Sequence, residues 1–106
     1  MKKYISTILF LTFLSTTFGQ QLDSIKYEYG RLYYHSYGKG ETIVMLSGGP
    51  GNNALQLESV ALKLSANYRI VLLEQRGAGM SIPTQFDSTT ITLKASISDI
   101  NLLLQN

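Results

Sequence analysis

Two glycine-rich segments hold the residues of this chain whose types and spacing suit catalysis. The first consists of Ser47, Gly48, Gly49, Pro50 and Gly51. Glycine lets the backbone approach a ligand closely and proline fixes one φ angle, so the N–H groups of this loop are free to face a developing negative charge. In acyl transfer such a loop forms an oxyanion hole. A plain strand-to-helix turn is the alternative that these five residues leave open.

The second segment follows an apolar run, residues 70–73, and contains Glu74, Gln75, Arg76, Gly77, Gly79 and Ser81. Open α/β sheets place their sites at the carboxyl ends of such strands. A dinucleotide fingerprint would need a third glycine where Ile82 stands, and no P-loop motif occurs. The segment therefore predicts a site at this end of the sheet and no cofactor.

Regular elements must position these two segments. Alternating residues over 25–37, interrupted by Gly30 and Arg31, predict an antiparallel hairpin. The uninterrupted apolar runs 43–46 and 70–73 predict two parallel strands covered on both faces. Together with the helices that follow each run, they indicate an α/β fold.

Two amphipathic helices are expected. The first follows the glycine loop, is capped by Asn52 or Asn53, and has an apolar face made of Leu57, Val60, Ala61 and Leu64. The second follows a loop over residues 78–90, is capped by Thr92, and has an apolar face made of Leu93, Ile97, Ile100 and Leu104.

The predicted order is a hairpin followed by a βαβα unit, with an incomplete sheet. A right-handed crossover joins the two apolar strands. A helix that ends a βα unit normally returns the chain to the sheet, so residues 20–106 are predicted to be the opening part of a larger α/β domain. The strand over 43–46 would keep an open edge, and we expect the chain to self-associate or to be only partly ordered.

The first 19 residues are typical of a signal peptide. Lys2 and Lys3 precede an apolar stretch that is too short for a membrane span, and Thr17-Phe18-Gly19 suits cleavage before Gln20. An uncleaved anchor is the alternative. Loss of the two lysines would take the formal net charge from +2 to zero, which leaves no basis for nucleic-acid binding. The chain has no cysteine, so export brings no disulfide.

Both glycine segments, in this order and at this spacing, resemble the α/β-hydrolase superfamily and most closely proline iminopeptidases. That family has His-Gly-Gly-Pro-Gly followed by Asp-Gln-Arg-Gly-x-Gly-x-Ser. The resemblance extends to Gly30-Arg31-Leu32 with Tyr34, and to residues 97–100, which look like the helix before the nucleophile. Serine replaces the usual histidine at Ser47, and glutamate replaces the usual aspartate at Glu74.

The resemblance implies a role for individual residues of both segments. Gly49 N–H would contribute to the oxyanion hole, while Gly48 and Pro50 shape the loop. Arg76, with Gly77 and Gly79, would support the active-site wall, either through an ion pair that orders the turn or by touching substrate. Ser81 is interpreted as a turn or capping serine, because it lies in no Gly-x-Ser-x-Gly elbow.

No catalytic triad can be assembled from this sequence. The superfamily needs an elbow serine, then an acid, then a histidine, and no Gly-x-Ser-x-Gly occurs. The one histidine, His35, lies in the early hairpin, where we expect a half-exposed strand residue. No cluster of metal ligands is predicted either.

Three functional hypotheses follow. The first is the N-terminal part of an exported proline iminopeptidase-like hydrolase, silent alone, whose parent releases N-terminal residues, often proline, from a peptide or small-molecule substrate. The second is a fragment of another α/β hydrolase, such as an esterase or epoxide hydrolase. The third is a non-catalytic exported interaction protein or remnant that uses its open strand edge.

Overall fold

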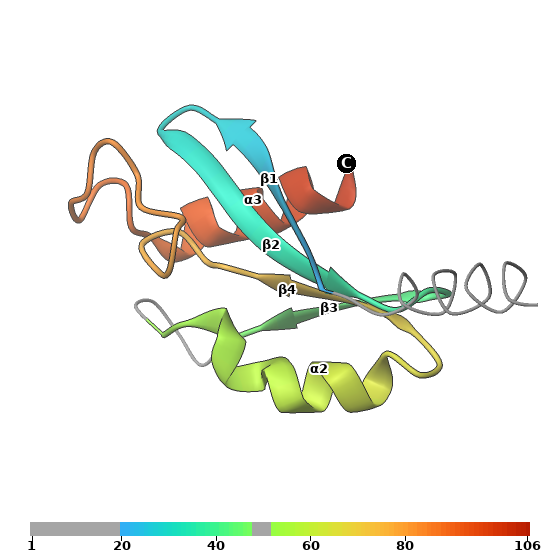
Figure 1. The fold of residues 1–106 in the computed structure, drawn as a ribbon. Coiled ribbons are helices and arrows are strands. Elements are labelled where there is room, and N and C mark those ends of the chain that lie inside the picture. The colour runs from blue at the N-terminus through green and yellow to red at the C-terminus, as the bar shows by residue number, and fades with distance from the viewer. Residues whose placement is uncertain (1–19, 48–51) are drawn as a thin grey trace, which may run out of the picture.

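The computed structural model describes residues 20–47 and 52–106, so the predicted leader, residues 1–19, lies outside the described part. One mixed sheet has the strand order β1-β2-β4-β3 (Figure 1). Its strands are β1 (Gln21–Tyr27), β2 (Gly30–Tyr37), β3 (Thr42–Leu46) and β4 (Arg69–Leu73). The helical elements are the 3-10 turn η1 (Ala54–Leu57), α2 (Glu58–Leu64) and α3 (Leu93–Leu104). Within the described ranges, no helix is long and apolar enough to cross a membrane.

The predicted hairpin is confirmed, with its turn in a different place. β1 and β2 pair antiparallel, and Tyr27 lies opposite Gly30. The turn residues are therefore Glu28 and Tyr29, whereas the sequence suggested a break at Gly30 and Arg31. Gly30, with φ of +137°, forms the first residue of β2 and closes the turn.

The parallel unit that carries both glycine segments is also confirmed. β3 pairs parallel with β4, and the chain between them forms η1 and α2. Asn53 caps this helical segment, because its side chain accepts a hydrogen bond from the Leu55 N–H at 2.8 Å. The helix begins as a 3-10 turn, so the helical segment starts at Ala54.

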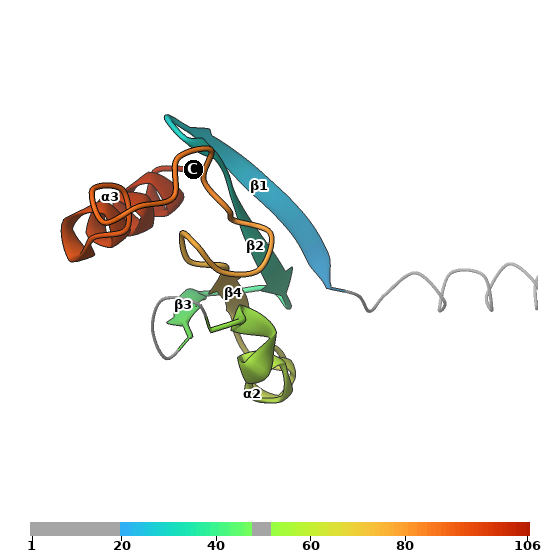
Figure 2. The same cartoon turned by 90° about the vertical axis from the view of Figure 1, so that its left-hand side faces the viewer.

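β4 is the strand around which two separate cores form. Ile70 and Leu72 face a cluster under α2, while Val71 and Leu73 face a cluster under α3. All four residues are at most 2% exposed, which confirms that this strand is covered on both faces. Figures 1 and 2 show α2 and α3 on opposite sides of the sheet.

The predicted apolar face of α3 is wrong for most of its members. Leu93, Ile97 and Leu104 are 80%, 51% and 65% exposed. The buried residues of this helix are instead Asp99 and Leu103, which are four residues apart and so share one face. The predicted Thr92 cap is confirmed, since its hydroxyl accepts a hydrogen bond from the Ala95 N–H at 3.0 Å.

The other predicted faces are corrected in part. Ala61 of α2 is buried as expected, but Val60 is 46% exposed. β3 is less covered than β4, and its last residue, Leu46, is 41% exposed. Within the described residues β3 pairs only with β4, so its outer edge offers free N–H and C=O groups.

This edge generates a prediction about self-association. Replacing Leu46→Lys should raise the dissociation constant for association of the full chain about tenfold, which corresponds to about 1.4 kcal/mol, because a charge on a strand edge opposes pairing. Sedimentation velocity over a concentration series measures this constant. Leu62→Lys is the matched control, since Leu62 is 54% exposed and lies on α2. Equal effects of both variants, or a monomeric wild-type chain, would contradict association through β3.

Candidate active-site wall and loop anchor

The turn over residues 74–81 is fastened to the neighbouring strand β2. The Glu74 N–H donates to the Tyr33 carbonyl at 2.9 Å, and the Tyr33 N–H donates to the Ser81 hydroxyl at 2.8 Å. The Gly77 N–H donates to the Ser81 carbonyl at 2.8 Å and closes the turn on itself. Ser81 is fully buried, so its hydroxyl serves the backbone of β2.

The Glu74 carboxylate lies inside this turn and shapes it. Glu74 is 3% exposed, and its Oε2 accepts a hydrogen bond from the Met80 N–H at 3.1 Å. Gly79 has φ of +55°, and a Cβ placed on it would lie 2.5 Å from Glu74 Oε1. Both the backbone angle and the lack of space require glycine at this position.

His35 is buried, so the prediction of a half-exposed strand histidine is wrong. It is 4% exposed, and its Nε2 lies 3.2 Å from Glu74 Oε1. The ring's Nδ1 contacts the side-chain amide nitrogen of Gln20. Nε2 has no hydrogen-bond partner among the described residues despite the nearby carboxylate. Register explains the burial: His35 lies opposite Leu72 of β4, in the middle of the sheet.

Gln75 and Ser47 hold together the two ends of the glycine loop. The Gln75 side-chain amide donates to the Ser47 carbonyl at 2.9 Å and to the Ser47 hydroxyl at 3.1 Å. The Ser47 hydroxyl in turn donates to the Asn52 carbonyl at 2.9 Å. Gly48, Gly49, Pro50 and Gly51 lie outside the described residues, but both residues that flank them are fixed to the carboxyl end of β4.

Arg76 forms a buried ion pair with Asp99 of α3. Its Nε and Nη2 donate to the two carboxylate oxygens at 3.0 and 2.7 Å, and Nη1 donates to the Thr90 carbonyl at 3.0 Å. The guanidinium also lies over two aromatic rings, 4.7 Å from the centroid of Tyr27 and 5.8 Å from that of Tyr29. Burial would lower the pKa of Arg76, but the hydrogen bonds and charge of Asp99 outweigh burial and raise it. The side chain stays charged and is engaged inside the fold.

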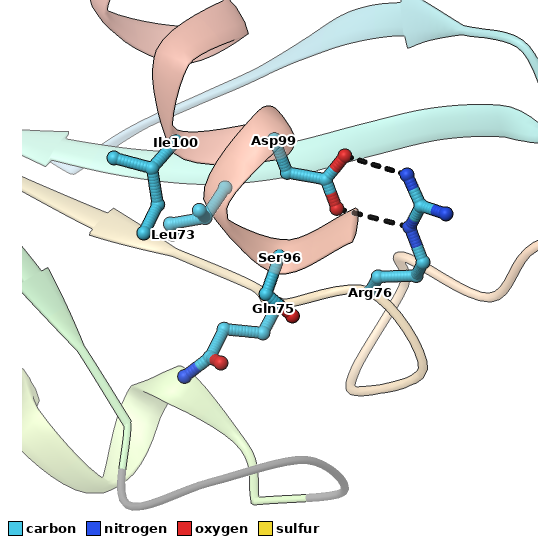
Figure 3. Close-up of a pocket in the computed structure, with 6 residues that line it drawn as sticks. All are labelled: Leu73, Gln75, Arg76, Ser96, Asp99 and Ile100. Atoms are coloured by element: carbon cyan, nitrogen blue, oxygen red, sulfur yellow. Dashed lines mark hydrogen bonds and ion pairs between the residues drawn. The ribbon is translucent and has the colours of Figure 1, made fainter. Parts of the chain in front are cut away.

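Figure 3 shows that Gln75 and Arg76 leave the strand end in opposite directions. Gln75 points toward the end of β3, and Arg76 points toward α3. The cavity beside the ion pair holds only about 10 Å³, room for no more than about one water molecule. This wall is therefore packed, and Arg76 has no space for a substrate group beside it. A larger hollow, about 860 Å³, lies at the opposite end of β4 beside Arg69.

The loop before α3 holds the third acceptor of Arg76 in place. Thr90 donates its N–H to Asp87 Oδ1 at 3.2 Å and its hydroxyl to the Gln85 carbonyl at 2.8 Å. Hydrogen bonds from Thr89 and Gln85 lower the pKa of Asp87 to about 2. Because this pKa is depressed, ionised Asp87 stabilises the loop at every pH above 3.8, the ordinary pKa of its side chain. The stabilisation is lost as the pH falls through about 2.

The sequence did not identify the partners of Arg76 and Glu74. Asp99 lies beside the predicted apolar residues Ile97 and Ile100, and its burial depends on its pairing with Arg76 from the end of β4. His35 carried no signal of its burial in the sequence. In the described part of the chain, no serine hydroxyl contacts His35, so no nucleophile–base pair is present there.

The sequence of this chain is similar to those of proline iminopeptidases. Proline iminopeptidases of Xylella fastidiosa and Xanthomonas citri are 38% and 41% identical to the chain over 78 and 70 residues. These alignments cover 70% and 62% of this chain but 25% and 22% of the relatives. The chain thus spans about a quarter of the length of the curated relatives that it matches. No family model matches it.

Solved structures show the same fold. The thioesterase domain from the curacin biosynthetic pathway superposes with a TM-score of 0.70 at 19% identity, covering 82% of this chain and 31% of that domain. An epoxide hydrolase from an endophytic Streptomyces gives 0.67 at 18% identity, covering 82% and 26%. A proline iminopeptidase-related protein of Thermus thermophilus gives 0.67 at 26% identity, covering 82% and 32%.

The chain is similar to proline iminopeptidases over most of its length, and its sheet and helices form part of an α/β-hydrolase fold. Two positions depart from the proline iminopeptidase pattern, and the side chains at both positions form hydrogen bonds within the fold. Ser47, in place of histidine, bridges Gln75 to Asn52. Glu74, in place of aspartate, extends into the turn as far as the Met80 N–H and His35.

Proposed function

We propose that this proline iminopeptidase-like chain supplies the oxyanion loop of an exported hydrolase and is catalytically silent by itself. The observation that carries the proposal is the anchor made by Gln75, Ser47 and Asn52. It ties both flanks of residues 48–51 to the carboxyl end of β4, where sites of open α/β sheets lie. The similarity to proline iminopeptidases supports the same assignment.

The chemistry assigned to the loop is stabilisation of charge. When a nucleophile attacks a peptide or ester carbonyl, the oxygen gains negative charge, and a fixed N–H donor stabilises it, typically by about 3 kcal/mol. Gly49 N–H is the proposed donor. In the parent enzyme the substrate would be a peptide or small molecule that carries an N-terminal residue, often proline. The acyl-serine intermediate requires an elbow serine that this sequence lacks.

A second candidate function is a non-catalytic one. The outer edge of β3, unpaired within the described residues, could add a strand from a partner, and the exposed stripe of Leu93, Ile97 and Leu104 on α3 offers a separate apolar surface. A stable stoichiometric complex of the native chain, isolated with a partner bound at β3, would favour this candidate.

Catalytic silence is tested on the purified full chain. We expect no turnover of a proline arylamide above the buffer rate, and no stoichiometric labelling by a fluorophosphonate probe, because the sequence contains no Gly-x-Ser-x-Gly elbow. An authentic proline iminopeptidase serves as the positive control in both assays. Turnover or labelling that is lost in Ser47→Ala or Ser81→Ala would contradict the proposal and identify the nucleophile.

Export is a separate part of the proposal. Expressed with its first 19 residues in a bacterial host, the chain should be recovered outside the cytoplasm beginning at Gln20. N-terminal sequencing of the recovered protein identifies the first residue. Exported material that retains Met1 would contradict cleavage. The control is the double variant Lys2→Glu, Lys3→Glu, whose leader lacks the basic start and should no longer direct export.

A further inference from the structure

We propose that His35 is a positioning residue: it donates a hydrogen bond from Nε2 to Glu74 and thereby holds the 74–81 turn in place. The inference rests on the proposed function, because this turn carries Gln75, the residue that anchors the flanks of the proposed oxyanion loop. His35 would act through Glu74 and would not touch substrate.

In the described part of the chain, a buried ring nitrogen without a hydrogen-bond partner faces a carboxylate oxygen. His35 Nε2 is buried without a hydrogen-bond partner among the described residues, and Glu74 Oε1 lies 3.2 Å away. The hydrogen bond that the carboxylate accepts, from the Met80 N–H, goes to the other oxygen, Oε2. Buried polar atoms without partners are costly and uncommon. A bond from Nε2 to Oε1 satisfies the ring nitrogen and gives the carboxylate a second donor beside the Met80 N–H.

The surroundings of the ring select the proton position that this bond needs. The Gln20 amide nitrogen lies against Nδ1, and we infer that it donates there and that Nδ1 accepts. A neutral imidazole with Nδ1 as acceptor carries its proton on Nε2. That proton then points to the side of the ring where Glu74 lies.

The other charged groups nearby are already engaged elsewhere. Glu58 of α2 accepts a hydrogen bond from the Tyr37 hydroxyl at 2.7 Å. Arg76, two residues after Glu74, pairs with Asp99 at 2.7 Å under α3. Within the described residues, His35 is therefore the side chain placed to pair with the Glu74 carboxylate.

The contact between His35 and Glu74 can affect the anchor that Gln75 forms with Ser47, because Gln75 directly follows Glu74 in the chain. Glu74 holds Met80 and packs against Gly79, so the carboxylate fixes the far end of the turn. Gln75 is the next residue along the chain and donates to Ser47. If Glu74 loses its second partner, the turn and then the Gln75 amide gain freedom.

Local hydrogen exchange in the full 106-residue chain tests this inference. In His35→Leu, we expect exchange of the Met80 N–H to rise about tenfold relative to wild type, since a buried polar group left unpaired shifts a local opening by about that factor. His35→Gln keeps a side-chain N–H that can reach Glu74 and should restore most of the protection. The Val71 N–H, in β4 but not opposite the substituted residue, reports global unfolding and is the internal control.

A spectroscopic measurement on the unmutated chain supplies a second test. Because the chain has one histidine, 15N labelling of histidine gives signals from a single ring. We expect the neutral ring to carry its proton on Nε2. A proton on Nδ1, or equal Met80 exchange in the Leu and Gln variants, would overturn the inference. Neither readout uses activity. If the proposed function is wrong, the fluorophosphonate probe labels the chain while the Met80 exchange and the histidine 15N signals stay as expected.

Discussion

The buried guanidinium of Arg76 is the interaction on which the rest of this structure depends. It is held by both oxygens of Asp99 and by the Thr90 carbonyl, and the Tyr27 ring covers it. A buried charge is tolerated only when its hydrogen bonds are satisfied, so each of these groups must be correctly placed at once. Arg76 thereby joins the hairpin, the end of β4 and α3.

The geometry of the candidate site follows from this constraint. Arg76 turns toward α3, and its neighbour Gln75 turns to the other side of the strand end, where it meets Ser47 (Figure 3). The same constraint sets the rotation of α3, because Asp99 must face the sheet. The Leu93, Ile97 and Leu104 side chains therefore stay exposed, while Ile100, Leu102 and Leu103 of the same helix pack against the core.

Local patterns in the sequence were enough to predict the helices and strands. The features that were predicted wrongly depend on contacts between residues far apart in the chain. The hairpin, the parallel strands and the Thr92 cap rest on neighbouring residues, and all three were predicted correctly apart from the position of the hairpin turn. The face of α3 was wrong because apolar spacing alone cannot reveal that Arg76 requires Asp99 inside. Burial of His35 was missed for the same reason, since Glu74 reaches it from a different strand. The residues of the wall were named from the sequence, but their partners were not.

A double-mutant cycle on Arg76 and Asp99 tests the central claim most directly. The free energy of unfolding in urea is measured at one fixed protein concentration for wild type, Arg76→Met, Asp99→Leu and the double variant, with Glu41→Gln as an exposed control. We predict that each single variant loses about 3 kcal/mol or more, because it leaves one charge or carboxylate buried alone, while the double variant recovers most of that loss. Single effects below about 0.5 kcal/mol, or losses that simply add, would contradict a structure organised around this pair.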